Sequence, residues 1–208
     1  MSGAMEITAV AVKDLREKTG AGIMDCKKAL KETEGDVEQA IDYLRRKGLA
    51  EAAKKTGRVS KEGMIESYVH PGGKIGVLVE INCETDFVAK TSDFAEFTKN
   101  IAMQVAAATP LYLERKVVPE AVVEKERGIY KDQALESGKP VKVIDRIVDG
   151  KMEKYFSQIC LLEQAYVRDP DVTVKELLDG LVAKLGENIS IRRFTRYQLS
   201  ENLDNERS

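Results

Sequence analysis

The sequence IGVLVEINCETDFVAK, residues 75–90, joins the most strand-like stretch of the chain to the start of a helix. Residues 75–81 are mostly β-branched or apolar, which is typical of a buried central strand. Just beyond it, the acid Asp86 and the aromatic Phe87 lie side by side. Strand ends that pass into loops often present binding side chains, so this turn is a candidate site. The structural alternative is that Thr85 or Asp86 caps the next helix and Phe87 packs beneath it.

Two further stretches with a period of two predict partners for this strand. The first, residues 64–69, leads to Pro-Gly-Gly at 71–73, a turn signal, so a β-hairpin is expected with the strand at 74–82. The segment 189–199 also alternates. We expect it to complete a three-stranded sheet.

The first fifty residues predict three short amphipathic helices. Glycines at 20, 22 and 35 separate them, and Asp36 with Gln39 forms a capping-box pattern at the start of the third. The apolar stripes are Ile7, Val10, Ala11 and Leu15; Ile23, Cys26 and Leu30; and Val37, Ala40, Ile41 and Leu44. Three such helices predict a compact bundle that is similar to ubiquitin-associated domains.

Together these patterns predict an α+β fold. The bundle occupies residues 5–50, a polar linker 51–62, and a core or dimerisation domain 63–208, in which helices pack on an antiparallel three-stranded sheet. Two long helical patterns on either side of a Ser-Gly-Lys-Pro turn predict an antiparallel helical hairpin that projects as an arm at about 119–160. A short helix at 173–185 precedes the last strand.

Composition excludes several classes of function. The chain has 208 residues, 43% hydrophobic and 33% charged, so it can form a packed core. With 33 basic and 35 acidic residues the net charge is −2, which gives no general signal for nucleic acid or membranes. No window has the ~20 apolar residues that span a bilayer. Arg192, Arg193 and Arg196 suggest RNA binding only weakly, because alternation divides them between two faces of a strand.

The sequence offers little for an enzyme. Its one histidine, His70, falls at a turn without a nucleophile at a known spacing, and it carries neither a phosphate-binding glycine loop nor a metal-ligand cluster. Cys26, Cys83 and Cys160 are widely spaced, which favours buried free thiols. We therefore expect a protein that acts by contact, without a cofactor or metal.

Four separated motifs resemble the bacterial elongation factor Ts family, whose members are guanine-nucleotide exchange factors for elongation factor Tu. They are KTGAGIMDCKKAL at residues 18–30, Thr-Asp-Phe at 85–87, Lys-Pro at 139–140 and Gly-Glu-Asn-Ile at 186–189. The resemblance extends from about Ile7 to Leu199. Agreement of four motifs in order is specific, whereas any one alone is weak.

The resemblance implies a mechanism for residues Thr85, Asp86, Phe87 and Val88. Elongation factor Tu holds GDP with a magnesium ion, and an exchange factor must favour the nucleotide-free state over the GDP-bound one. By resemblance, Phe87 inserts between helices of the nucleotide domain of Tu, and Asp86 accompanies it. Side chains and backbone near the β-phosphate then shift, and the magnesium ion is lost.

The resemblance also implies a second contact, made by Arg16, Ile23 and Met24 of the N-terminal bundle. Helical spacing puts Ile23 in the apolar stripe, whereas Met24 lies about a hundred degrees round the helix from it. The alternatives are a surface salt bridge for Arg16 and incidental exposure for Met24.

The chain resembles the short form of the family, which implies a homodimer. A cysteine that can reinforce the dimer in that form corresponds here to Thr195, so packing alone would hold the two copies. The expected free thiols favour the reducing cytoplasm, and the balanced charge gives no reason to expect direct binding of nucleic acid. The main alternative is an adaptor that binds ubiquitin-like or nascent-chain partners through the bundle; such an adaptor needs no Asp86-Phe87 wedge.

Overall fold

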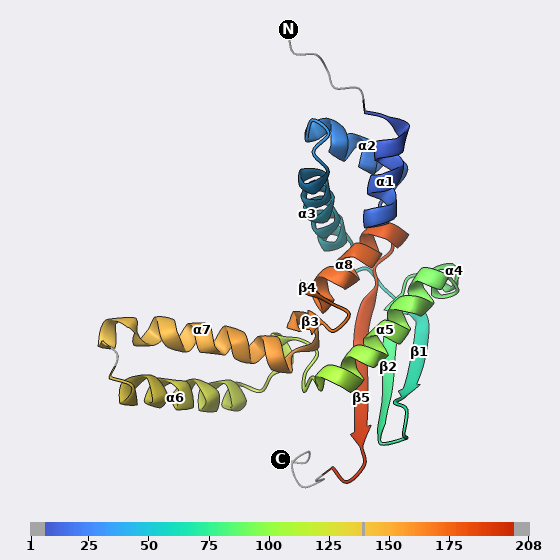
Figure 1. Ribbon diagram of the computed structural model, residues 1–208. Helices are drawn as coiled ribbons and strands as arrows, with labels where there is room; N and C mark the ends of the chain where they lie inside the picture. Colours follow the sequence, from blue (N-terminus) through green and yellow to red (C-terminus); the bar gives the residue numbers. More distant parts are fainter. Residues whose placement is uncertain (1–6, 139, 202–208) are drawn as a thin grey trace. The chain divides into compact units, whose positions relative to one another are not determined.

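The protein is described here from a computed structural model, which covers residues 7–138 and 140–201 (Figure 1). Lys139 of the predicted Lys-Pro turn lies outside the described residues, as do residues 5–6 of the predicted bundle and 202–208 of the predicted core domain.

The described chain combines an antiparallel sheet with runs of consecutive helices, which confirms the α+β class. The α-helices are α1 (Ala9–Thr19), α2 (Ile23–Glu32), α3 (Val37–Lys55), α4 (Asp86–Ala89), α5 (Ser92–Ala108), α6 (Glu120–Glu136), α7 (Val141–Ile159) and α8 (Val174–Leu185). The strands are β1 (Glu62–Val69), β2 (Ile75–Cys83), β3 (Ala165–Tyr166), β4 (Asp169–Thr173) and β5 (Ser190–Gln198). Short 3₁₀ turns lie at η1 (Arg115–Val117) and η2 (Leu161–Glu163).

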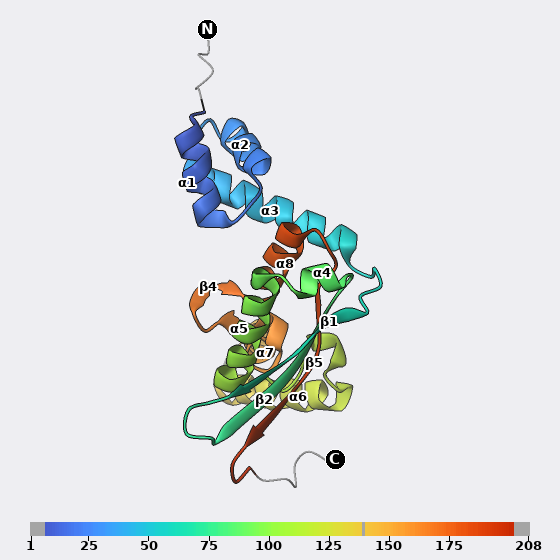
Figure 2. The ribbon, with the colours of Figure 1, turned by 90° about the vertical axis from the view of Figure 1, so that its right-hand side faces the viewer.

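The main sheet has the strand order β1-β2-β5 and is antiparallel, as the arrows in Figures 1 and 2 show. The β1–β2 connection is the predicted tight hairpin, in which the His70 amide donates to the Ile75 carbonyl over 2.9 Å. Alternation in β2 buries Val77 and Val79 and leaves Leu78 exposed. The prediction of a central strand, with segment 189–199 completing the sheet, is therefore confirmed, although only one face of β2 is buried.

Backbone contacts divide the described chain into two compact units, and each is described by itself. The first comprises residues 7–64, 82–95 and 176–190. The second comprises residues 65–81, 96–175 and 191–201.

In the first unit, α1, α2 and α3 form the predicted bundle. Gly20 adopts a left-handed conformation (φ +67°) that ends α1, and Asp36 caps α3 by accepting the Gln39 amide hydrogen over 3.0 Å. The buried cluster is Val12, Leu15, Cys26, Ala29, Leu30, Ala40 and Leu44. Two stripe predictions were wrong: Val10 is exposed because Val12 takes the core position in α1, and Ile23 is exposed because it begins α2.

Helix α3 continues through residues 51–55, the start of the predicted linker. The Cβ of Ala183 in α8 lies 3.5 Å from where a Cβ on Gly48 would be, and Lys55 donates to the Val182 carbonyl over 3.5 Å. An ion pair between Arg45 and Glu176 also links α3 to α8. The domain boundaries themselves stay a prediction.

In the second unit, α6 and α7 form the predicted antiparallel helical hairpin with a core of its own (Figure 1). Its buried residues are Ala134, Ile144, Val148 and Met152. At the base of the hairpin Arg115 donates to both Glu153 and Glu163, which raises the pKa of its guanidinium. The sequence did not predict the β3–β4 pair, because its strands are too short to establish a periodic pattern.

Candidate functional site

Residues 85–88 form a short helical turn rather than the start of a long helix. The Thr85 hydroxyl accepts the Val88 amide hydrogen over 3.4 Å, which makes Thr85 the N-cap of α4. Helix α4 stops at Ala89, and a second cap follows: the Thr91 hydroxyl accepts the Phe94 amide hydrogen over 3.3 Å at the start of α5. Two threonines six residues apart therefore each begin a helix: the expected cap by Thr85 belongs to the short α4, and the helix that carries Phe94 begins only at Ser92.

Phe87 lies on the open side of this turn. It is 80% exposed, whereas its neighbours Val88 and Ala89 are buried. The alternative in which Phe87 packs beneath a helix is therefore excluded. Of the four predicted partner-binding residues, Phe87 is the exposed one, and the side chain of Val88 anchors the turn from within.

Asp86 forms an ion pair within the same turn. The Lys90 ammonium group donates to the Asp86 carboxylate over 2.6 Å, and this hydrogen bond holds the pKa of Asp86 below its usual range. Since Thr85 is the cap, the expectation that Asp86 could cap the helix was wrong. Asp86 is instead a partly exposed, ionised carboxylate directly beside Phe87.

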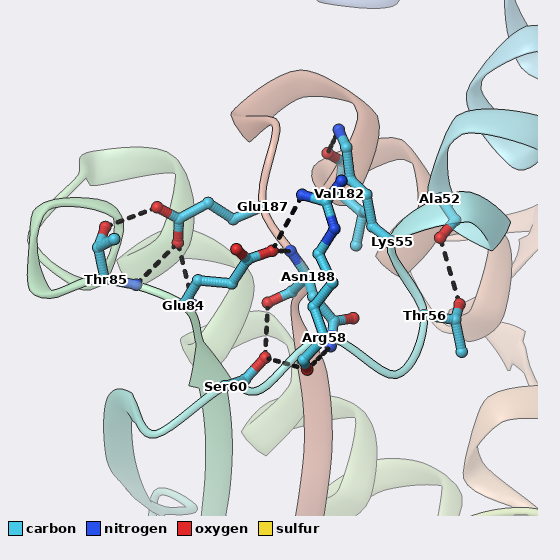
Figure 3. A network of polar contacts seen from close by, with 10 residues as sticks. All are labelled: Ala52, Lys55, Thr56, Arg58, Ser60, Glu84, Thr85, Val182, Glu187 and Asn188. Atoms are coloured by element: carbon cyan, nitrogen blue, oxygen red, sulfur yellow. Dashed lines mark hydrogen bonds and ion pairs between the residues drawn. The ribbon is translucent and has the colours of Figure 1, made fainter.

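The start of the turn is fixed by residues that lie about a hundred positions further along the chain (Figure 3). One Glu187 carboxylate oxygen accepts the amide hydrogens of Glu84 and Thr85, each over 3.0 Å. The other accepts the Thr85 hydroxyl hydrogen over 2.6 Å. In return the Asn188 amide donates to the Glu84 carboxylate over 2.6 Å.

Cys83 adds one more contact to Thr85 from the end of β2. Its buried thiol donates to the Thr85 carbonyl over 3.1 Å. Burial raises the pKa of this thiol to about 11, and the nearby negative charge of Glu187 contributes in the same direction. The thiol therefore stays protonated, and able to donate, at neutral pH. The three cysteines are free and buried, as predicted.

Sequence reasoning assigned no role to Glu187 or Glu84. Gly186 to Ile189 served only as a resemblance motif. The one sequence feature that could have indicated Glu187 is the glycine before it. Gly186 has a left-handed backbone (φ +78°) and ends α8, so Glu187 leaves the helix at a sharp turn. Which backbone amides it meets depends on tertiary structure.

The N-terminal candidates lie at the surface of the bundle. Met24 is 74% exposed and Ile23 is 55% exposed, at the first two positions of α2. Arg16 is exposed near the end of α1, and within the described ranges no ion-pair partner is found for its guanidinium. The salt-bridge alternative for Arg16 therefore has no support. Asp25, the next residue of α2, pairs with Lys47 of α3 and ties the helix to the bundle.

The arginines that suggested RNA binding are engaged within the second unit. Arg193 donates to Glu80 over 2.7 Å, Arg192 lies 3.6 Å from the same carboxylate, and Arg196 donates to the Ala106 carbonyl over 3.4 Å. Two of the three arginines share one carboxylate, and all three have partners within the second unit.

Residues 7–138 and 140–201 contain neither a cluster of metal-binding side chains nor a helix that could span a membrane. No group of three or more histidine, cysteine, aspartate or glutamate residues there is arranged to hold a metal ion. Within the same residues, every helix is too short or too polar to traverse a bilayer.

Comparison with known proteins gives one consistent result. The family model described as "Elongation factor TS" matches residues 11–181. Elongation factor Ts of Thermoanaerobacter sp. (strain X514) is 62% identical over 198 residues, which cover 95% of this chain and 97% of that protein. Those of Carboxydothermus hydrogenoformans and Syntrophomonas wolfei are 59% and 60% identical and cover 95% and 96% of this chain, and 91% and 94% of their own lengths. The chain therefore belongs to the elongation factor Ts family.

Proposed function

We propose that the protein promotes the release of GDP from elongation factor Tu, so that GTP can replace it. The observation that carries this proposal is Phe87, which is 80% exposed on a turn whose backbone is fixed by a cap and by Glu187. A large aromatic side chain held in water by a rigid turn adds little to the core. It is suited to act as a preformed anchor in a protein interface.

In the proposed mechanism Phe87 enters between helices of the nucleotide-binding domain of elongation factor Tu. Asp86 is adjacent and ionised, and its ion pair with Lys90 brings both charged groups to the same place. Insertion shifts the groups that hold magnesium and the β-phosphate, and the magnesium ion leaves. GDP then loses its main counter-charge and dissociates faster.

The exchange requires only differential binding. The protein binds both the GDP-bound and the nucleotide-free forms of elongation factor Tu, but the nucleotide-free form more tightly. By thermodynamic linkage, the factor by which the protein weakens GDP binding equals the factor by which GDP weakens the binding of the protein. The protein itself makes or breaks no covalent bond and binds no nucleotide, so we do not propose an enzyme. Because its partner works in translation, we place it in the cytoplasm.

The second proposed contact is the surface formed by Arg16, Ile23 and Met24. Two exposed apolar side chains at the start of α2, and an arginine with no ion-pair partner among residues 7–138 and 140–201, suit a small interface near the nucleotide. This contact contributes affinity, whereas the turn at residues 85–88 changes the nucleotide site.

We also propose a homodimer that forms through the open face of the sheet. The exposed apolar residues of the strands and their ends are Ile65, Val69, Leu78, Tyr197 and Leu199. Apolar side chains on an uncovered sheet face favour self-association. Thr195 cannot form a disulfide, so packing alone would hold this dimer.

Thermodynamic linkage provides the test. The dissociation constant of the protein would be measured by calorimetry against nucleotide-free elongation factor Tu and against the GDP complex with magnesium. We expect much tighter binding to the nucleotide-free form. Equal affinity for the two forms would contradict the proposal, because a ligand without differential affinity shifts no equilibrium.

A further inference from the structure

We infer that Glu187 is a positioning residue for the proposed exchange activity: its carboxylate fixes the turn from which Phe87 projects. The inference rests on the proposed function and extends it to a residue remote in sequence from the Thr-Asp-Phe motif. All of the contacts that support it lie within the first unit.

Glu187 holds two backbone amides at the start of the turn. Glu84 and Thr85 are the last residues before α4, and helix formation leaves amide groups near this point without helical partners. A single Glu187 oxygen accepts both amide hydrogens, each over 3.0 Å. A carboxylate that accepts two adjacent amides fixes the orientation of both peptide planes, and charge makes these bonds stronger than neutral ones. Glu187 thereby sets the direction in which the chain enters α4.

Glu187 also orients the hydroxyl of Thr85, the N-cap of α4. The Thr85 hydroxyl donates its hydrogen to the other Glu187 oxygen over 2.6 Å, so its lone pairs are directed away from Glu187. One of them accepts the Val88 amide hydrogen over 3.4 Å. Glu187 therefore acts on Val88 through Thr85. Phe87 lies between Thr85 and Val88, which this hydrogen bond joins, so the backbone of Phe87 is restrained on both sides.

Glu187 must itself be held to position anything else. Gly186 ends α8 with a left-handed backbone, and Asn188 donates its amide hydrogen to the Glu84 carboxylate over 2.6 Å. The Asn188 side chain donates to the Arg58 carbonyl over 2.7 Å, while the Arg58 guanidinium lies 3.6 Å from Glu84 (Figure 3). Glu187 thus accepts backbone amide hydrogens from the segment that carries Glu84, and Glu84 accepts one from the segment that carries Glu187.

The variant Glu187→Gln keeps the shape of the side chain and removes the second acceptor. If the remaining amide oxygen faces the two backbone amides, its NH₂ group faces the Thr85 hydroxyl, which then loses its acceptor. If the amide is flipped, its NH₂ group faces two other donors. Either arrangement loosens the turn. Glu201→Gln is the matched control, because Glu201 also accepts a backbone amide hydrogen, from Gln198 over 3.1 Å, in the second unit.

The test measures GDP release from elongation factor Tu over a range of protein concentrations, for the wild type, Glu187→Gln, Glu201→Gln, Phe87→Ala and the double variant Glu187→Gln/Phe87→Ala. We expect Glu187→Gln to lower the maximal release rate about tenfold, equivalent to about 1.4 kcal/mol, with a smaller change in half-saturating concentration. Partial unfolding would instead raise the half-saturating concentration and leave the maximal rate unchanged. In the Phe87→Ala background, Glu187→Gln should have no further effect, because it acts through Phe87.

Amide hydrogen exchange provides a readout that needs no partner. Glu187→Gln should accelerate exchange at Glu84 and Thr85, and Glu201→Gln should not. Should Glu187→Gln fail to fold, Thr85→Val replaces the hydroxyl that joins Glu187 to the Val88 amide by a methyl group and should reproduce the loss of maximal rate.

The outcomes separate the two proposals. If the wild type does not accelerate release, the proposed function fails. If the wild type accelerates release and Phe87→Ala does not, an unchanged maximal rate in Glu187→Gln overturns only the role of Glu187. Unchanged amide exchange, or an equal loss in the Phe87→Ala background, also overturns it.

Discussion

The variant Phe87→Ala distinguishes between two roles for this side chain, because loss of a binding anchor lowers activity whereas loss of a core residue lowers stability. Complete burial of a phenylalanine side chain contributes about 1.5–3 kcal/mol, and Phe87 is 80% exposed, so Phe87→Ala should lower the free energy of unfolding by less than ~0.6 kcal/mol. For a chain of this length that shifts the melting temperature by about 2 °C or less. The loss at an interface should be larger, because central aromatic anchors contribute about 2 kcal/mol or more.

The assay is stopped-flow release of a fluorescent GDP analogue from elongation factor Tu, combined with thermal melts of the same samples. A loss of about 2 kcal/mol corresponds to an approximately 30-fold slower release at equal protein concentration. Phe94→Ala is the matched control, since Phe94 is fully buried and its truncation should cost about 3–5 kcal/mol of stability. A Phe87→Ala protein that is clearly destabilised but has normal activity per folded molecule would refute the reasoning.

Three other predictions follow from the same structure. Met24→Ala should leave the melting temperature nearly unchanged, because Met24 is 74% exposed, and weaken binding to elongation factor Tu in calorimetry; unchanged affinity would remove Met24 from the interface. Light scattering at micromolar concentration should report about twice 23.1 kDa with or without reductant, and a monomer at all concentrations would exclude the dimer. The pKa of Cys83 rises from its ordinary 9.0 to about 11 in the folded chain, so its contribution to stability is complete below pH 9 and is lost as pH rises to 11, by about 2–3 kcal/mol. Denaturant titrations should therefore show a shallower alkaline loss in Cys83→Ala than in the wild type, and parallel pH profiles would contradict the assignment.

Local patterns predicted most of the fold because they are set within a few residues. Gly20 ends α1 and Asp36 caps α3 through interactions no more than four residues away. The run of β-branched and apolar residues that forms β2 is similarly local and identifies the strand, but not which of its faces is buried. These features depend on backbone conformation and nearest neighbours, which the sequence displays directly.

The predictions that failed depended on tertiary structure, which determines which side chains pack in a core and which residues distant in sequence come into contact. Val10 and Ile23 match an apolar stripe, but each lies at or near the start of its helix and remains exposed. In the candidate site, the sequence identified the turn and its resemblance to a family motif. It did not identify Glu187, because a contact between residues 85 and 187 is determined by how α8 and β5 bring the chain back to the end of β2.

The most direct measurement is the rate of GDP release from elongation factor Tu as a function of the concentration of this protein. The experiment uses a fluorescent GDP analogue in the presence of magnesium and excess unlabelled nucleotide. The proposed mechanism predicts that the release rate rises with protein concentration and reaches a plateau far above the spontaneous rate. A release rate that stays at the spontaneous value at saturating protein would contradict the central claim.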